Sequence, residues 1–369
     1  MSTTNETNGR HIGVNQQILE TLSRNPTVLS RYDLSEYNDD TTEFLTQKDL
    51  ETKNKSAKSI TEKALKRHRK DERFGPILSD LARIEFGVQH FDEYLRDHVS
   101  HPVYVYLLGL LLMTEVPVFR KIDALTWKLA ALLHDVGYPP QLFLTSLKQY
   151  VDKATQTGDN RDSLCQYKYV FSLVGPQKLV FHDQDTFSAI NGKLRSWNIR
   201  LNLLKAHRNF LRIGEINHGI LSSLIVTKVI DYLYHEKNHD RSETKLDDFD
   251  VDWGWSCFRT QILDAAAAIS IHDILGKYQR TRLSANKQCV AYLLVLCDTI
   301  QQWDRPQQQR VIRPEDVEIT LTEHSIHCRL SNLPPDKAND VRVVISKLKP
   351  FDPRLDIEID PSTPDPRIH

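Results

Sequence analysis

The feature that most constrains this chain is a series of apolar stretches in which hydrophobic residues recur every three or four positions. They follow one another from residue 77 to about residue 304: ILSDLARIEFGVQHFDEYL, HPVYVYLLGLLLM, LTWKLAALLHD, HGILSSLIVTKVIDYLY, QILDAAAAISIHDIL and CVAYLLVLCDTIQQW. This spacing is typical of α-helices that bury one face, so it predicts a mainly α fold. Two stretches, 151–200 and 236–258, interrupt the pattern.

The two ends of the chain differ from this helical part. Residues 1–55 are polar, and we expect a loosely ordered arm with one short helix near residues 14–22. Residues 56–73 are strongly charged, with an apolar stripe at Ile60, Ala64 and Leu65, which favours a solvated helix face over a phosphate- or partner-binding patch. After Pro306, VEITLTEHSIHCRL predicts a hairpin, DKANDVRVVISKLKPF a helix and RLDIEID a last strand. The expected division is an arm with a charged helix (1–75), a helical domain (76–308) and a small α+β (ββαβ) module (309–369).

Composition excludes several classes of protein. The chain has 369 residues, of which 40% are hydrophobic and 26% charged, with a formal net charge of −1. These values are typical of a globular protein. The chain has no excess of positive charge that would indicate binding to nucleic acid. The most apolar run, 103–113, is shorter than the roughly 20 residues that cross a bilayer, so we expect a buried helix and no membrane. A polar N-terminus and five irregularly spaced cysteines favour a reducing cytoplasm over a secreted, disulfide-linked protein.

The segment LAALLHDVGYPP ends an apolar run with two polar side chains, His134 and Asp135. We expect a buried helix from Trp127 to Asp135 that is terminated by Gly137 and the two prolines after it. A helix C-terminus carries partial negative charge, and a buried carboxylate without a partner is costly. An imidazole and a carboxylate at this position therefore favour a bound cation.

Histidine and aspartate residues stand next to apolar runs at several other places in the helical part. His272 and Asp273 follow AAAAISI, and Asp298 follows VAYLLVLC. His218 precedes GILSSLIV, and His101 precedes PVYVYLLGLLL. Each one alone suits a hydrogen-bonded core or capping residue, but together they can serve as one another's buried partners.

The ordered set His101, His134-Asp135, His218, His272 and Asp298 resembles the H…HD…H…H…D pattern of the HD-domain metal-dependent phosphohydrolase superfamily, over roughly residues 80–305. The resemblance implies a helical bundle that holds one or two divalent metals (Mn, Fe, Mg, Ni, Co or Zn), with His134 and Asp135 at the catalytic centre. It implies a first metal on His101, His134, Asp135 and Asp298. Asp135 would bridge to a second metal on His218 and His272.

The chemistry that this resemblance implies is attack of a metal-bound hydroxide on a phosphate ester of a nucleotide or related small molecule. Candidate phosphate ligands are Lys128, Arg96, Arg212 and Arg305; Arg212 ends a basic stretch that a solvated helix face explains equally well. Because Pro102 follows His101, His98 remains an alternative first ligand. We expect Asp273 to orient an imidazole.

Two other classes of function remain open. Some members of the superfamily use six such ligands as di-iron oxygenases. The segments RDHVSHPVYVYLLGLLLM, WKLAALLHDVGYP and LVLCDTIQQWDR also resemble HD segments that precede Hsp90-like ATPase domains in bacterial proteins. That resemblance allows a regulatory or ligand-binding module that works with a separately encoded partner or as a homo-oligomer.

Overall fold

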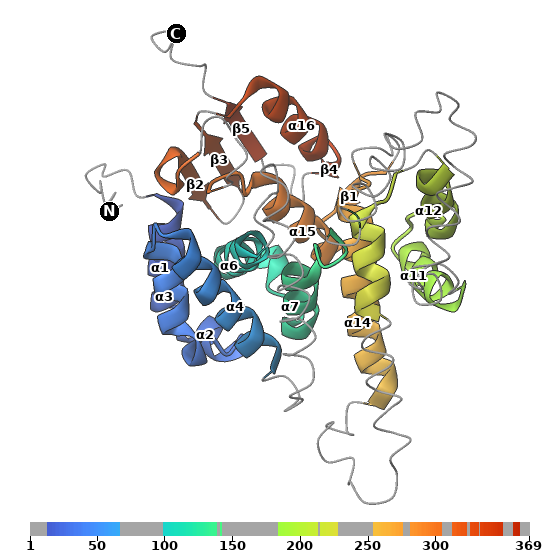
Figure 1. Ribbon diagram of the computed structural model, residues 1–369, viewed down its shortest axis with the longest axis horizontal. Helices are drawn as coiled ribbons and strands as arrows, with labels where there is room; N and C mark the ends of the chain where they lie inside the picture. The colour runs from blue at the N-terminus through green and yellow to red at the C-terminus, as the bar shows by residue number, and fades with distance from the viewer. Residues whose placement is uncertain are drawn as a thin grey trace, which may run out of the picture.

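The structure is a computed structural model of the 369-residue chain. It describes residues 13–66, 99–138, 141, 184–212, 215–227, 254–275, 281–304, 312–322, 325–331, 333–349 and 357–361. As the sequence predicts, the chain is mainly α-helical, with a few short strands near its C-terminal end (Figure 1).

Four helices form the centre of the molecule: α6 (Ser100–Glu115), α7 (Ala124–Leu133), α14 (Gly254–His272) and α15 (Cys289–Ile300). Helix α7 packs against α6, α14 and α15, and α14 also packs against α15 (Figure 1). Almost every residue of α6 is buried, which confirms the buried helix expected over residues 103–113. Among the described residues, no helix combines the length and apolarity that crossing a membrane requires.

The N-terminal region is more ordered than its composition suggests. Residues 13–66 form α1 (Val14–Arg24), α2 (Pro26–Arg31), α3 (Asn38–Thr46) and α4 (Leu50–Lys66), with a short 3-10 helix at Leu34–Glu36. Both α1 and α4 pack on α6, and their apolar side chains join the common core. The short helix expected near residues 14–22 is present as α1, but residues 25–55 are helical and packed, not loosely ordered, because a small number of apolar residues at helical spacing anchors them. The apolar stripe at Ile60, Ala64 and Leu65 is buried.

The interrupted stretch 151–200 also contains regular structure. Helix α11 (Gln184–Ser196) falls inside it and packs on α14, and α12 (Leu203–Arg212) packs on α11. The helical pattern of α11 is weak in sequence because its buried apolar residues, Phe187, Ile190 and Leu194, are few and separated by polar ones. The part of this stretch before residue 184 lies outside the described residues.

The C-terminal elements follow in the order β2 (Val317–Leu321), β3 (Ile326–Leu330), α16 (Pro335–Ile345), β4 (Leu348–Lys349) and β5 (Ile357–Pro361), after a 3-10 helix at Pro314–Asp316. The antiparallel pair β2–β3 and the parallel pair β3–β5 make one sheet of order β2-β3-β5. The short strand β4 pairs with β1 (Leu283–Ser284), which precedes α15. The C-terminal strands thus contact the helical part, and the domain boundaries at 75 and 308 stay predictions.

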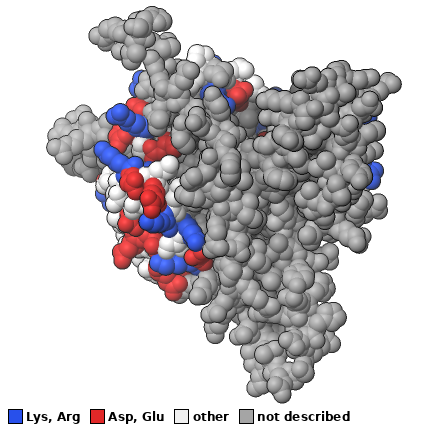
Figure 2. Space-filling view, viewed as in Figure 1, with Lys and Arg blue, Asp and Glu red and all other residues white. Residues whose placement is uncertain are grey.

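Charge is mixed on the described part of the surface. On the face shown in Figure 2, basic and acidic side chains alternate over the N-terminal helices instead of forming areas of one sign. Exposed pairs such as Lys55–Glu51 and Lys63–Asp40 contribute to this alternation. The charged stretch of α4 therefore fits the solvated helix face that the sequence favours.

Candidate metal centre

The turn after α7 presents the two central side chains, His134 and Asp135. Helix α7 ends at Leu133, two residues earlier than expected, and residues 134–137 form successive turns. The backbone N–H of Tyr138 donates to the carbonyl of Asp135 at 2.8 Å, which closes this turn. The change from helix to turn directs the imidazole and the carboxylate into the space between α6, α14 and α15.

Two glycines allow the backbone to approach closely enough to build the centre. A Cβ on Gly137 would lie 2.6 Å from the carbonyl oxygen of His218 and 2.6 Å from the amide nitrogen of Ser222. A Cβ on Gly219 would lie 2.9 Å from the carbonyl of Ile269 and 3.0 Å from His272 Cε1. The helical segment 218–227 therefore packs between the turn after α7 and the end of α14 only because both positions lack a side chain.

A first group of donor atoms comes from α6, α7 and α15. His101 Nε2 lies 2.9 Å from Asp298 Oδ1 and 3.3 Å from His134 Nε2, and His134 Nε2 lies 3.9 Å from Asp298 Oδ1. Asp135 Oδ2 lies 3.5 Å from His134 Nε2 and 3.9 Å from His101 Nε2. His101, His134 and Asp298 are close enough together to hold a metal ion.

A second group shares the same aspartate. Asp135 Oδ1 lies 3.4 Å from His218 Nε2 and 3.9 Å from His272 Nε2. His134, Asp135 and His272 form another group within metal-binding distance. The two oxygens of Asp135 thus face different pairs of histidines, one pair on each side.

Each of the four histidines has its other ring nitrogen, Nδ1, engaged outside the cluster. His134 Nδ1 lies 2.8 Å from the carbonyl of Ala131, and His272 Nδ1 lies 2.6 Å from the carbonyl of Ile269. A carbonyl accepts only, so Nδ1 carries a proton in both rings, and Nε2 is the nitrogen available to a metal when it carries none. The tautomer with the proton on Nδ1 is the one that binds a metal through Nε2.

The Nδ1 atoms of the other two histidines, His101 and His218, contact side-chain amides instead of backbone carbonyls. His101 Nδ1 lies 2.5 Å from Gln301 Oε1, and His218 Nδ1 lies 3.2 Å from Gln141 Oε1. Asp273 Oδ2 lies 3.6 Å from His218 Nδ1, and its role in orienting an imidazole stays a prediction. All four Nε2 atoms therefore point toward Asp135 or Asp298.

Burial and charge make this cluster favourable for a cation. His101, His134, Asp135 and His272 are buried, whereas the side chains of Asp298 and His218 are 28% and 17% exposed. Burial alone would raise the pKa of Asp298, but its hydrogen bond with His101 and the charge of the nearby imidazoles outweigh this effect and hold that pKa below its usual range. Asp298 is therefore a carboxylate at neutral pH.

The donor atoms fit divalent metals by type and by spacing. Two ligands that each bind a cation at about 2.1 Å lie roughly 3.0–3.4 Å apart. The shortest spacing between donor atoms of the cluster is 2.9 Å, and the donor atoms of each group of three lie within 4.8 Å of one another. Imidazole nitrogen with carboxylate oxygen suits Mn, Fe, Co, Ni and Zn, whereas Mg prefers oxygen alone. The buried His and Asp groups can hold a metal ion.

The other candidate residues from the sequence lie in different places. Lys128 is fully buried on α7, with its ammonium 3.2 Å from Asp33 Oδ2 in the N-terminal region. Arg212 is exposed at the end of α12, six residues before His218. Arg96, Arg305 and the alternative ligand His98 lie outside the described residues. His101 is the second residue of α6 and Pro102 the third, where the helix requires no N–H, so the proline neither delays nor kinks the helix start.

Sequence reasoning missed three amides around the centre: Gln301, Gln141 and Asn217. Asn217 caps the segment 218–227 by accepting from the amide of Ile220 at 2.9 Å, and its side chain also donates to Asp273. An Asn directly before an apolar helical run is an N-cap signal that could have identified Asn217. Nothing local marks the two glutamines, because their partners are 77 and 200 residues away.

Comparison with known proteins returned no match to any family model, curated protein or solved structure.

Proposed function

We propose that this protein is a metal-dependent phosphohydrolase with an HD-type helical bundle, which cleaves a phosphate ester of a nucleotide or related small molecule. The observation that carries the proposal is the position of Asp135. Its Oδ2 faces His101 and His134, and its Oδ1 faces His218 and His272. A carboxylate with two separate pairs of imidazoles is the arrangement that a bridging ligand between two cations needs.

Divalent cations at this centre would activate a water molecule and neutralise the charge that develops on the phosphoryl oxygens. The residues of the chain prepare the centre for this chemistry. The Nδ1 contacts of the four histidines fix the rings so that little reorganisation is required when a ligand binds. Asp135, only 7% exposed at its side chain, is protected from competing water.

The substrate would approach from the side of Asp298 and His218, whose side chains are the more exposed members of the cluster. Arg212 lies at the end of α12, close in sequence to His218, and its exposed guanidinium suits an anionic substrate. Lys128 is engaged by Asp33, so we regard it as a structural cation first and a phosphate ligand second.

The test is metal analysis of full-length protein purified without chelator, combined with turnover of a panel of nucleotides and phosphate esters in added manganese. Wild type is compared with Asp135→Asn, and Asp304→Asn is the matched control, because Asp304 is a carboxylate outside the cluster. We expect about two metals per chain and phosphate release in wild type and control, with both lost in Asp135→Asn.

Three outcomes would contradict the proposal. Bound iron with oxygen consumption and no phosphate release would identify the di-iron oxygenase alternative. Metal retention without turnover of any ester would favour the regulatory module. Metal-free wild-type protein would mean that the six side chains only hydrogen-bond to one another in the core.

A further inference from the structure

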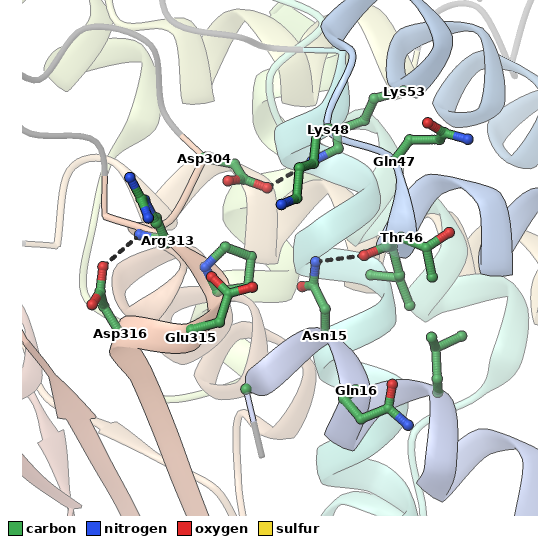
Figure 3. A pocket seen from close by; sticks show the side chains of 14 residues that line it. Asn15, Gln16, Thr46, Gln47, Lys48, Lys53, Asp304, Arg313, Glu315 and Asp316 are labelled. Carbon is green, nitrogen blue, oxygen red and sulfur yellow. Dashed lines mark hydrogen bonds and ion pairs between the residues drawn. The ribbon is translucent and has the colours of Figure 1, made fainter. Parts of the chain in front are cut away.

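A cavity of about 950 Å³ lies apart from the six side chains of the metal centre (Figure 3). Its wall comes from the start of α1, the loop between α3 and α4, the residue Asp304 after α15, and the 3-10 helix Pro314–Asp316. This volume is in the range of small-molecule sites, about 300–1,000 Å³. None of the six candidate metal ligands lines it.

One wall of the cavity contains an ion pair within the chain. Lys53 Nζ lies 2.7 Å from Asp304 Oδ2 and 3.0 Å from the hydroxyl of Tyr104, and that hydroxyl donates to Asp304 at 2.7 Å. Asp316 accepts from the backbone N–H of Arg313 at 3.0 Å, a contact that fixes its carboxylate but leaves its charge in place. Lys48, Arg313 and Glu315 are the exposed charged groups of the lining.

The two exposed cations favour an anionic group between them. Lys48 and Arg313 lie on two sides of the cavity, with the exposed acid Glu315 and the half-buried acid Asp316 beside Arg313 in sequence (Figure 3). Asn15 and Gln16, in the first turn of α1, line the cavity. This turn has no acidic residue and no side-chain cap. Its free N–H groups and partial positive charge add to the two cations.

A buried acceptor at the wall of the cavity favours a ligand that carries a hydrogen-bond donor. Asn15 is 8% exposed, and its amide nitrogen donates to the carbonyl of Leu45 at 2.9 Å. Asn15 Oδ1 has no hydrogen-bond partner within the described parts of the chain. A buried acceptor without a donor is unfavourable by itself, so a ligand that supplies an N–H or O–H would stabilise this wall.

We propose that this cavity is a second small-molecule site, for an organic anion that also carries a hydrogen-bond donor. The anionic group binds between Lys48, Arg313 and the first turn of α1, and the donor is directed to Asn15. The inference does not depend on the proposed function of the metal centre, because the two sets of residues are different.

The experiment is calorimetric titration of the full-length protein with three probes at pH 8. Glycerol 3-phosphate has an anionic group and hydroxyl donors, methyl phosphate has the anionic group alone, and glycerol has the donors alone. We expect saturable binding of glycerol 3-phosphate, weaker binding of methyl phosphate and no binding of glycerol. Titrations run with chelator and with manganese, and in Asp135→Asn, separate this site from the metal centre.

Paired charge reversals test the location. In Lys48→Glu/Arg313→Glu, we expect the affinity for glycerol 3-phosphate to fall about ten- to a hundredfold, because two charge-assisted contacts are reversed. The matched control is Lys55→Glu/Lys58→Glu, which makes the same change in net charge on the exposed surface of α4, and it should bind as wild type does.

Several results would overturn the proposal. These are no saturable binding of glycerol 3-phosphate, equal affinity in the two double variants, or binding that Asp135→Asn abolishes. The last would place the probe at the metal centre, while metal stoichiometry and phosphate release would still decide the proposed function on their own.

Discussion

Two carboxylates six residues apart at the end of α15 are neutralised in different ways. Asp298 lies among imidazoles, 2.9 Å from His101 Nε2 and 3.9 Å from His134 Nε2. Asp304 lies 2.7 Å from the ammonium of Lys53 and accepts from the Tyr104 hydroxyl. His101 and Tyr104 occupy adjacent positions one turn apart on α6, so the same two segments build both environments.

The difference indicates which carboxylate can accept a cation from outside the chain. Lysine carries its charge at any physiological pH, so Asp304 has a permanent counter-ion within the chain. His134 and His272 instead donate from Nδ1 to backbone carbonyls, so a metal can replace any proton on their Nε2 atoms. A cluster of imidazole nitrogens and carboxylates becomes more stable when a metal binds, whereas an ion pair does not.

The largest effect expected from this comparison is stabilisation by metal. A metal present at about a thousand times its dissociation constant stabilises the folded protein by about 4 kcal/mol. We expect chelator to lower the melting temperature of wild type and Asp304→Asn by similar amounts, and that of Asp298→Asn much less. Differential scanning calorimetry with and without chelator measures this. Equal chelator effects in the two variants would remove the distinction between the carboxylates.

The second prediction concerns the resident ion pair. Lys53→Met removes the counter-ion of Asp304, and because the side chains of this pair are only 8% and 23% exposed, we expect a loss of about 3 kcal/mol in the free energy of unfolding. The double variant Lys53→Met/Asp304→Asn should recover much of this loss, and metal stoichiometry should stay unchanged in both. Urea denaturation measures the stability. A double variant as unstable as the single one would mean that the charge on Asp304 is not the cause.

The central helices and the N-terminal helices differ in how far the sequence predicts them. The central helices were predictable because their apolar residues form long runs, as in α6 and α15. The N-terminal helices were not, because their buried apolar residues, such as Val14, Ile18 and Phe44, are separated by many polar ones. Composition averages over such a segment, whereas packing depends on the few positions that face the core.

The candidate site shows the same limit. The six ligand-type residues were found because each one begins or ends an apolar run, a signal within a single segment. The cavity by Asp304 was not found, because Asn15, Lys48 and Arg313 come from three distant segments with ordinary local sequence. Their proximity is a product of the tertiary fold alone.

A third prediction compares the cluster with a buried histidine outside it, His207. Burial, with a further contribution from Arg208, lowers the pKa of His207 from 6.5 to about 4. The unfolded chain therefore binds more protons than the folded one between pH 6.5 and 4, so stability falls as the pH falls through this window. With saturating metal to hold the cluster, we expect wild type to lose about 2 kcal/mol between pH 7 and pH 5 beyond the loss in His207→Leu.

Chemical denaturation at several pH values provides this comparison. Parallel pH profiles of wild type and His207→Leu would show that His207 takes up its proton without unfolding cost. A steeper profile in wild type would show that a buried imidazole costs stability in acid when it lies outside the metal cluster.

The smallest expected effect is a change in metal affinity when the amide that orients His101 is removed. Gln301 accepts from His101 Nδ1 and donates to the carbonyl of Trp303 at 2.8 Å, so it fixes the ring whose Nε2 faces Asp298. In Gln301→Leu we expect metal affinity to fall about tenfold, near 1.4 kcal/mol, because an unanchored ring must be ordered by the metal itself. Gln302→Leu is the matched control, since this neighbouring buried amide bonds to Thr299 and not to a ligand. Competition titration against a fluorescent chelator resolves a tenfold change. If both variants bind metal as wild type does, the tautomer of His101 is set without Gln301, and the surrounding helices alone hold the imidazoles in place.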